Sequence, residues 1–175
     1  MNTNPKARTT DSRRMLQGGA GSFTARARGF LGNEFLLTAE DEDRGRLKML
    51  GLRGAELETG GRKILVDRLA DSRYEVAFGD GDVLYASPGE GSGSGLEMQC
   101  AGRSYTAAVS FFRNQAIVRD ETGADVVRIS GAATGRSYEV DIVVEDRCAL
   151  PISALLIYHT AINRRRAYQA MAGKR

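Results

Sequence analysis

The side chains best suited to acid–base or metal chemistry are few and widely separated. The chain of 175 residues contains one histidine, His159, and two cysteines, Cys100 and Cys148. A multi-histidine metal site and a zinc cage of four Cys and His ligands both need more of these side chains. His159 falls within an apolar segment, so we interpret it as a hydrogen-bonded structural residue and not as a general base or a metal ligand.

The two cysteines lie far apart in segments that look ordered and apolar. Cysteine is among the residue types most often buried, and a domain of this length does not need a covalent staple. We therefore expect Cys100 and Cys148 to be buried free thiols, with a disulfide between them as the alternative.

Acidic residues gather in two segments that could offer oxygen ligands to calcium. Residues 40–43 read Glu-Asp-Glu-Asp, and Asp80 and Asp82 flank Gly81. Neither segment follows the twelve-residue calcium loop with its terminal Glu. The sequence therefore predicts solvated acidic turns, no metal site and no cofactor.

Known catalytic motifs are also missing. The glycine-rich runs lack the last glycine of a dinucleotide-binding fingerprint, and the run over residues 91–95 has Gly93 where a nucleophile elbow needs Ser. From these observations we expect a protein that is not an enzyme.

Basic residues are concentrated at the two ends of the chain. Residues 1–30 carry six Lys/Arg and one acid, residues 164–175 carry five Lys/Arg and no acid, and the segment between them has 14 bases against 21 acids. Arg164, Arg165 and Arg166, with Lys174 and Arg175 after them, are candidates for contact with an anionic phospholipid surface. The alternative is that they serve solubility and the helix dipole. Nucleic acid is not expected as a partner, because aromatic residues that could stack on single strands are not interleaved with these basic residues.

Most of the chain alternates between apolar and polar residues with a period of two. Tyr138, Val140 and Ile142 alternate with polar neighbours, and the segments 74–78, 96–100 and 105–111 do the same. This pattern predicts half-buried antiparallel strands, about twelve in all. Glycine supplies the positive φ that hairpin turns need, and we expect it at the turns around residues 32, 60–61, 81, 123 and 131. Residues 87–95 predict a flexible surface loop.

The pattern changes after Glu145. Residues 149–162 are apolar on every side of a helical wheel, and a helix of that kind is buried all round. The stretch Cys148–Ile162 spans about 22 Å, which is short of a bilayer core of roughly 30 Å, so protein is favoured over lipid as its surroundings. A barrel of twelve strands is too wide for its own side chains to fill, and this segment is suited to fill its axis.

This organisation, and above all the stretch SYEVDIVVEDRCALPISALLIYHTAINRRR, resembles the tubby C-terminal-like superfamily, which includes the LURP-one-related proteins and the phospholipid scramblases. The resemblance covers roughly residues 22–168. It implies an antiparallel closed β-barrel of twelve strands that encloses a hydrophobic C-terminal α-helix. No catalytic signature, phosphoinositide-binding residue or calcium segment of the family can be matched to this sequence.

These observations define the expected organisation and function. We expect a disordered basic tail over 1–21, a barrel domain over 22–168 with a central helix at about 147–166, and a basic tail over 169–175. The favoured function is a non-enzymatic binding or scaffold module in the cytoplasm, peripheral at the inner face of the membrane, where it contacts anionic phospholipid. The alternative is a membrane-inserted, scramblase-like protein with residues 148–162 as a lipid-facing anchor.

Overall fold

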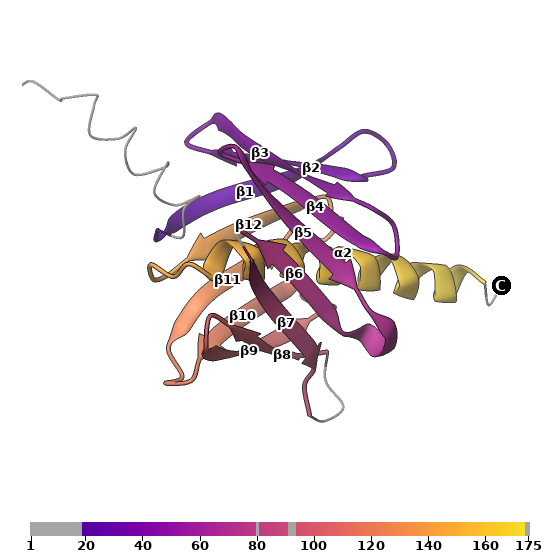
Figure 1. The fold of residues 1–175 in the computed structure, drawn as a ribbon. Coiled ribbons are helices and arrows are strands. Elements are labelled where there is room, and N and C mark those ends of the chain that lie inside the picture. The colour runs from indigo at the N-terminus through magenta and orange to yellow at the C-terminus, as the bar shows by residue number, and fades with distance from the viewer. Residues whose placement is uncertain (1–18, 80, 91–93, 174–175) are drawn as a thin grey trace, which may run out of the picture.

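Twelve antiparallel strands form a closed barrel around one helix in the computed structural model, which describes residues 19–79, 81–90 and 94–173 (Figure 1). Each strand pairs with its neighbours in the chain, and β1 pairs with β12 to close the barrel, with Phe23 opposite Val140. The elements are β1 (Gly21–Arg28), β2 (Glu34–Ala39), β3 (Glu42–Met49), β4 (Gly54–Thr59), β5 (Arg62–Arg68), a short 3₁₀ turn η1 (Ala70–Ser72), β6 (Tyr74–Phe78), β7 (Asp82–Pro88), β8 (Leu96–Cys100), β9 (Arg103–Ser110), β10 (Gln115–Asp120), β11 (Asp125–Gly131), β12 (Ser137–Ile142) and α2 (Ala149–Ala172).

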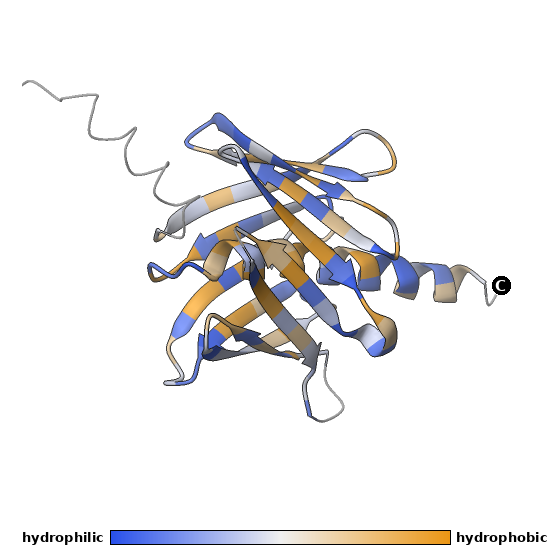
Figure 2. Cartoon of the chain, in the orientation of Figure 1, coloured by the Kyte–Doolittle hydropathy of each residue, from blue (hydrophilic) through white to orange (hydrophobic). Residues whose placement is uncertain are grey.

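The strands turn alternate side chains toward the barrel interior. In β8, Leu96, Met98 and Cys100 are buried while the two residues between them are exposed. Figure 2 shows the same alternation as bands of hydrophobic and hydrophilic colour along most strands. The period of two in the sequence is therefore the period of the barrel wall.

Helix α2 fills the axis of the barrel. Every residue from Ala149 to Ile162 is buried, and this stretch contributes a large share of the apolar core. The predicted fold class is confirmed. The lipid-facing arrangement is not the one observed, because the barrel wall surrounds residues 149–162. Among the described residues, no helix is both long enough and apolar enough to cross a bilayer.

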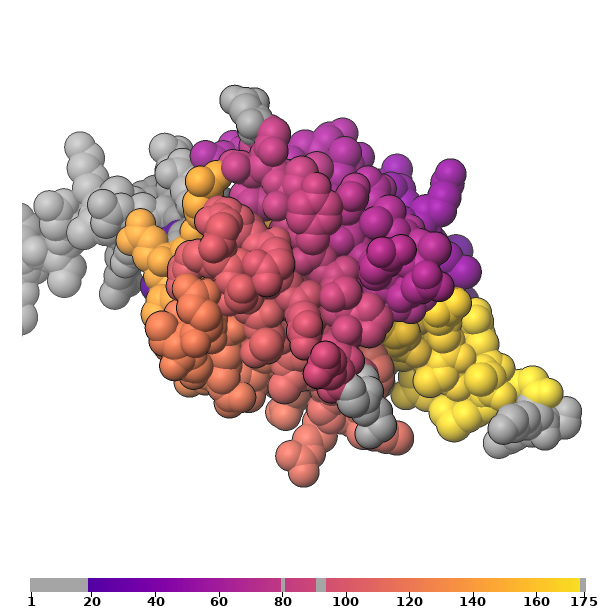
Figure 3. All heavy atoms as spheres, turned by 60° about the horizontal axis from the view of Figure 1, so that its bottom comes forward, coloured from indigo at the N-terminus to yellow at the C-terminus, as the bar shows by residue number. Residues whose placement is uncertain are grey.

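The helix is longer than the sequence predicts. It begins at Ala149 and continues to Ala172, so residues 169–172, predicted as tail, are helical. From Arg166 onward its residues are exposed, and this part projects beyond the barrel (Figures 1 and 3). At the other end of the chain β1 begins at Gly21, one residue earlier than predicted, while residues 1–18 of the expected tail lie outside the described part.

The expectation of two free thiols is wrong, because Cys100 and Cys148 form a disulfide. Cys100 ends β8, and Cys148 immediately precedes α2. The axial position of the helix brings their Cα atoms to 6.3 Å, within the usual range for a disulfide. Sequence spacing could not show this proximity, since it arises only when the barrel closes around the helix. Disulfides are typical of oxidising compartments, which sets this finding against the expected cytoplasmic location.

Most of the predicted glycine turns adopt a positive φ, including Gly32, Gly60, Gly61, Gly81 and Gly123. The expectation for residue 131 is wrong. Gly131 ends β11 and is needed for space, because a Cβ there would lie 2.0 Å from the Asn114 side chain. Of the loop predicted over 87–95, its first two residues belong to β7, and residues 91–93 lie outside the described part.

Candidate functional site: the helix-exit rim

Because the strands run up and down in chain order, successive loops lie at opposite ends of the barrel. The end from which α2 emerges is called the helix-exit rim. It comprises α2 from residue 163 onward and the described residues of the loops at 29–33, 50–53, 69–73, 89–95, 111–114 and 132–136. Contacts from α2 locate these loops: the Tyr158 hydroxyl donates to the carbonyl of Gly51 at 3.0 Å, and Arg164 donates to that of Phe111 at 3.0 Å.

Large apolar side chains are exposed at this rim. Phe112 and Phe30 are almost fully exposed, at 104% and 95%. Among the described residues ten large hydrophobic side chains are exposed, and eight of them are on the helix-exit rim: Phe30, Leu31, Leu50, Leu52, Leu69, Phe112, Tyr168 and Met171. Single exposed apolar residues are ordinary, but a set gathered at one end of a domain is typical of an interaction surface.

Charge is divided between the same two ends. The described rim residues include seven arginines, Arg53, Arg73, Arg113, Arg136, Arg164, Arg165 and Arg166, against the two acids Asp71 and Glu90. The described loops of the opposite end hold the acids Glu40, Asp41, Glu121, Glu145 and Asp146 against one base, Arg147. The excess of acids between residues 31 and 163 is therefore unevenly placed, and the barrel has one basic end and one acidic end.

Arg164 and Arg165 hold loops of the rim. Besides the Phe111 carbonyl, Arg164 donates to the carbonyl of Ala133, and its guanidinium lies 5.7 Å from the Tyr168 ring centre. Arg165 donates to the Asn33 side chain at 3.2 Å and to the carbonyl of Gly32. These two guanidiniums are half-buried and make structural bonds, which residue type alone does not reveal.

Arg166 is placed differently from its two neighbours. Its side chain is exposed on the projecting part of α2. The three predicted contact residues thus share the rim, with Arg166 the most open to a partner. Lys174 and Arg175 lie outside the described residues. The exposed loop residues Phe30 and Phe112 were missed by the sequence reasoning, although aromatic residues at hairpin tips are a usable signal.

His159 has the structural role expected of it. Its Nδ1 accepts a hydrogen bond from the Tyr74 hydroxyl at 2.7 Å, and Nε2 faces the carbonyl of Ser94 at 3.4 Å. Asn163, one turn further along α2, also lies 3.2 Å from Nδ1. Burial lowers the pKa of His159 to about 4, and burial raises the pKa of Tyr74 to about 12. Both side chains are therefore neutral at pH 7.

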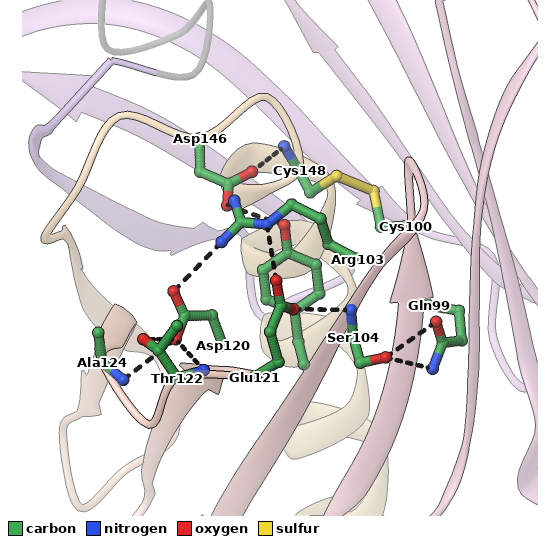
Figure 4. A network of polar contacts seen from close by, with 11 residues as sticks. Gln99, Cys100, Arg103, Ser104, Asp120, Glu121, Thr122, Ala124, Asp146 and Cys148 are labelled. Carbon is green, nitrogen blue, oxygen red and sulfur yellow. Dashed lines mark hydrogen bonds and ion pairs between the residues drawn. A yellow bond between two sulfur atoms is a disulfide. The ribbon is translucent and has the colours of Figure 1, made fainter.

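A polar network fixes the start of α2 at the opposite end (Figure 4). The buried carboxylate of Asp146 accepts hydrogen bonds from Arg103 and from the Tyr105 hydroxyl, both at 2.8 Å. Its second oxygen accepts the backbone N–H of Cys148 at 2.8 Å. Figure 4 shows this carboxylate beside the disulfide to Cys100, so one cluster ties the wall to the helix.

The acidic turns do not converge on a common point. Within the described residues no group of three or more His, Cys, Asp or Glu side chains is placed to hold a metal ion. Asp43 accepts the backbone N–H of Gly45, and Asp82 pairs with Arg147. Asp80 lies outside the described residues.

Two hollows are relevant to binding. A groove of about 530 Å³ runs over β1, β2 and β10–β12 and has mixed charge, because its lining includes Arg128 and the acids Glu40, Glu139 and Asp141. A pocket of about 220 Å³ lies at the helix-exit rim between α2 and the loops that follow β1 and β11. Arg136, Arg164 and Arg165 all line this second pocket.

Comparison with known proteins supports the fold. No protein-family model and no curated protein matches the chain. A solved X-ray structure of a protein from Arabidopsis thaliana is similar, with a TM-score of 0.54 and 15% sequence identity, covering 81% of this chain and 92% of the other. At that identity the likeness concerns the fold alone.

Proposed function

We propose that the protein is a non-enzymatic binding module of the tubby and LURP-one type, which associates with anionic phospholipid surfaces through the helix-exit rim. The observation that carries the proposal is that the exposed apolar side chains and the excess of arginine share one end of the barrel. The family assignment has separate support, namely the sequence resemblance and the twelve strands around an apolar helix.

The composition of the rim suits a charged lipid interface. Leu52 precedes Arg53 and Phe112 precedes Arg113, so two loops pair an apolar tip with a guanidinium. Burying one such apolar side chain contributes about 1.5–3 kcal/mol, and each basic residue near an anionic leaflet adds about 1 kcal/mol. The acidic opposite end would be repelled by the same surface, and this repulsion favours one orientation.

A protein partner is less well supported than a membrane. Two exposed phenylalanines stand on separate loops, 82 positions apart in the chain, and the described residues around them are rich in arginine and poor in acids. Loop tips that end in aromatic residues can enter the headgroup region while arginines remain at its surface. Anionic lipid is concentrated at the inner face of the membrane, the location expected from the sequence. Because the disulfide favours an oxidising compartment, the proposal concerns the lipid chemistry and not the compartment.

Vesicle sedimentation tests the proposal. The full chain is mixed with phosphatidylcholine vesicles that contain or lack phosphatidylserine, at low and high salt. We expect binding only to the anionic vesicles, and we expect it to weaken as salt shortens the Debye length. Phe112→Ser should weaken binding about tenfold and Arg113→Gln about fivefold.

Matched controls lie elsewhere on the barrel wall. Tyr85 is an exposed aromatic residue on β7, and Arg62 is an exposed arginine at the opposite end. Tyr85→Ser and Arg62→Gln should leave vesicle binding unchanged. Equal binding to neutral and anionic vesicles contradicts the proposal. Equal losses of binding in the rim and control variants also contradict it, and either result favours a protein partner.

A further inference from the structure

Three guanidinium groups surround the pocket of about 220 Å³ at the helix-exit rim. Arg164 and Arg165 reach it from α2, and Arg136 reaches it from the loop between β11 and β12. A Cβ on Gly32 would lie 3.5 Å from Nη2 of Arg165 and 3.9 Å from Nη1 of Arg136. A Cβ on Gly135 would lie 3.1 Å from Nε of Arg164. The two glycines therefore leave the room in which the guanidiniums approach.

These three guanidinium groups are hydrogen-bonded to neutral oxygens, mostly backbone carbonyls, and not to carboxylates. Arg136 donates to the carbonyl of Gly29 at 2.7 Å and to that of Phe30 at 3.2 Å. In the described part of the chain none of the three guanidiniums forms an ion pair with Asp or Glu. Like charges held close together without a counter-ion repel one another, and a bound anion removes that cost.

The remaining surface of the pocket suits a compact anion with an attached apolar group. Each guanidinium has five N–H donors, so donors remain after the bonds to the loops are made. Thr134 adds a hydroxyl to the lining, and Phe35, Ala27 and Leu31 provide apolar walls. Arginine binds tetrahedral oxyanions with paired, charge-assisted hydrogen bonds, which makes phosphate the anion best matched to this set.

We propose that the pocket formed by Arg136, Arg164 and Arg165 binds a phosphate group. The inference rests on the proposed function where the phosphate belongs to a lipid headgroup, and the same chemistry would hold a free phosphate ester. It differs from general attraction to an anionic surface, because it requires these three residues and not the other rim arginines.

Calorimetry of the full chain tests the inference. Inorganic phosphate is titrated at constant ionic strength with chloride as the balancing anion, and a short-chain phosphatidic acid is titrated below its micelle concentration. We expect saturable binding of one phosphate group. A phosphatidic acid affinity at least tenfold above that of inorganic phosphate indicates a lipid headgroup, and similar affinities indicate a free phosphate ester.

Arg136 offers the sharpest variant because it is exposed and lies on a loop. Arg136→Gln should weaken phosphate binding about tenfold, whereas Arg136→Lys should retain part of it. Arg113→Gln is the matched control, because Arg113 belongs to the rim but does not line the pocket. It should weaken vesicle binding and leave phosphate binding unchanged.

Melting curves accompany each titration, so that a folding defect is recognised. If Arg136→Gln fails to fold, Arg136→Lys and Arg113→Gln carry the comparison. No saturable binding to the wild type, or equal losses in the Arg136 and Arg113 variants, overturns the phosphate site. Vesicle binding without phosphate binding overturns this inference alone, and phosphate binding without vesicle binding overturns only the proposed membrane function.

Discussion

The hydroxyl of Tyr74 donates a hydrogen bond of 2.7 Å to Nδ1 of His159 and so joins strand β6 to the axial helix. The two rings also meet edge to face, with centres 5.5 Å apart. Nε2 faces the carbonyl of Ser94, which places the ring proton on Nε2 and leaves Nδ1 as the acceptor. This is the neutral imidazole that burial favours.

Stability should therefore depend on pH through His159. The pKa of His159 is about 4 in the folded state because of burial, against an ordinary value of 6.5. Between pH 4 and pH 6.5 the imidazole of the unfolded chain is protonated, whereas that of the folded protein is neutral. The contribution is fully present above pH 6.5, and up to about 3 kcal/mol is lost as the pH falls toward 4.

Urea unfolding at pH 7.5 and pH 4.5 measures this dependence. Carboxylates also titrate in the range, so the wild type is compared with His159→Gln at each pH. The free-energy difference between the two should shrink as the pH falls. If the free energies of unfolding of the wild type and His159→Gln differ by the same amount at pH 7.5 and pH 4.5, His159 is not the source of the pH dependence.

The axial helix should tolerate no charge at its centre. Leu156 is fully buried, and Leu156→Asp would place a carboxylate within the core at a cost of several kcal/mol, which is comparable to the whole stability of a typical domain. Circular dichroism should show loss of the cooperative melting transition. Gln169→Asp, on the projecting part of the same helix, is the control and should melt like the wild type. A folded Leu156→Asp protein would contradict the axial placement.

Removing the disulfide should lower stability without changing the fold. The bond closes a loop with a sequence separation of 48, which in the chain-entropy model corresponds to about 4 kcal/mol. The Cys100→Ser/Cys148→Ser double variant should unfold at lower urea concentration, and addition of a dithiol to unfolded wild type should produce a similar shift. Coincident unfolding curves for the oxidised protein and the double variant would show that the bond contributes nothing.

Substitution of the three neighbouring arginines of α2 should affect thermal stability at Arg164 and Arg165 but not at Arg166. Arg164→Gln and Arg165→Gln each remove bonds to loop carbonyls and should cost about 1 kcal/mol, given their partial exposure. Arg166→Gln should leave the melting temperature unchanged. Thermal melting of the three single variants checks this, and equal effects at all three positions would contradict the structural role assigned to Arg164 and Arg165.

The fold was predictable because two periods in the sequence report directly on burial. Alternation such as that of Leu96, Met98 and Cys100 indicates a sheet with one face exposed to solvent. The apolar surface of residues 149–162 indicates a helix that is buried on all sides. Both signals are local, and they remain legible without knowledge of the tertiary arrangement.

The rest of the site depends on distances that the sequence does not contain. The bond from Arg165 to the loop residue Gly32 spans 133 positions, and the disulfide partners are 48 positions apart. The difference between Arg164 and Arg166 was equally hidden, because three consecutive arginines on a helix point in directions about 100° apart. Only the barrel wall decides which of them meets a loop.

The placement of α2 also sets the order in which the protein can fold as it is made. All twelve strands precede the segment that fills the space between them, and β1 must wait for β12, more than a hundred residues later, before the wall can close. Until residues 149–162 leave the ribosome, the strands have no complete core to pack against, and their inward side chains remain open to water or to other chains. A ribosome paused before this segment would therefore hold an aggregation-prone sheet, which makes the protein a candidate for chaperone protection during synthesis.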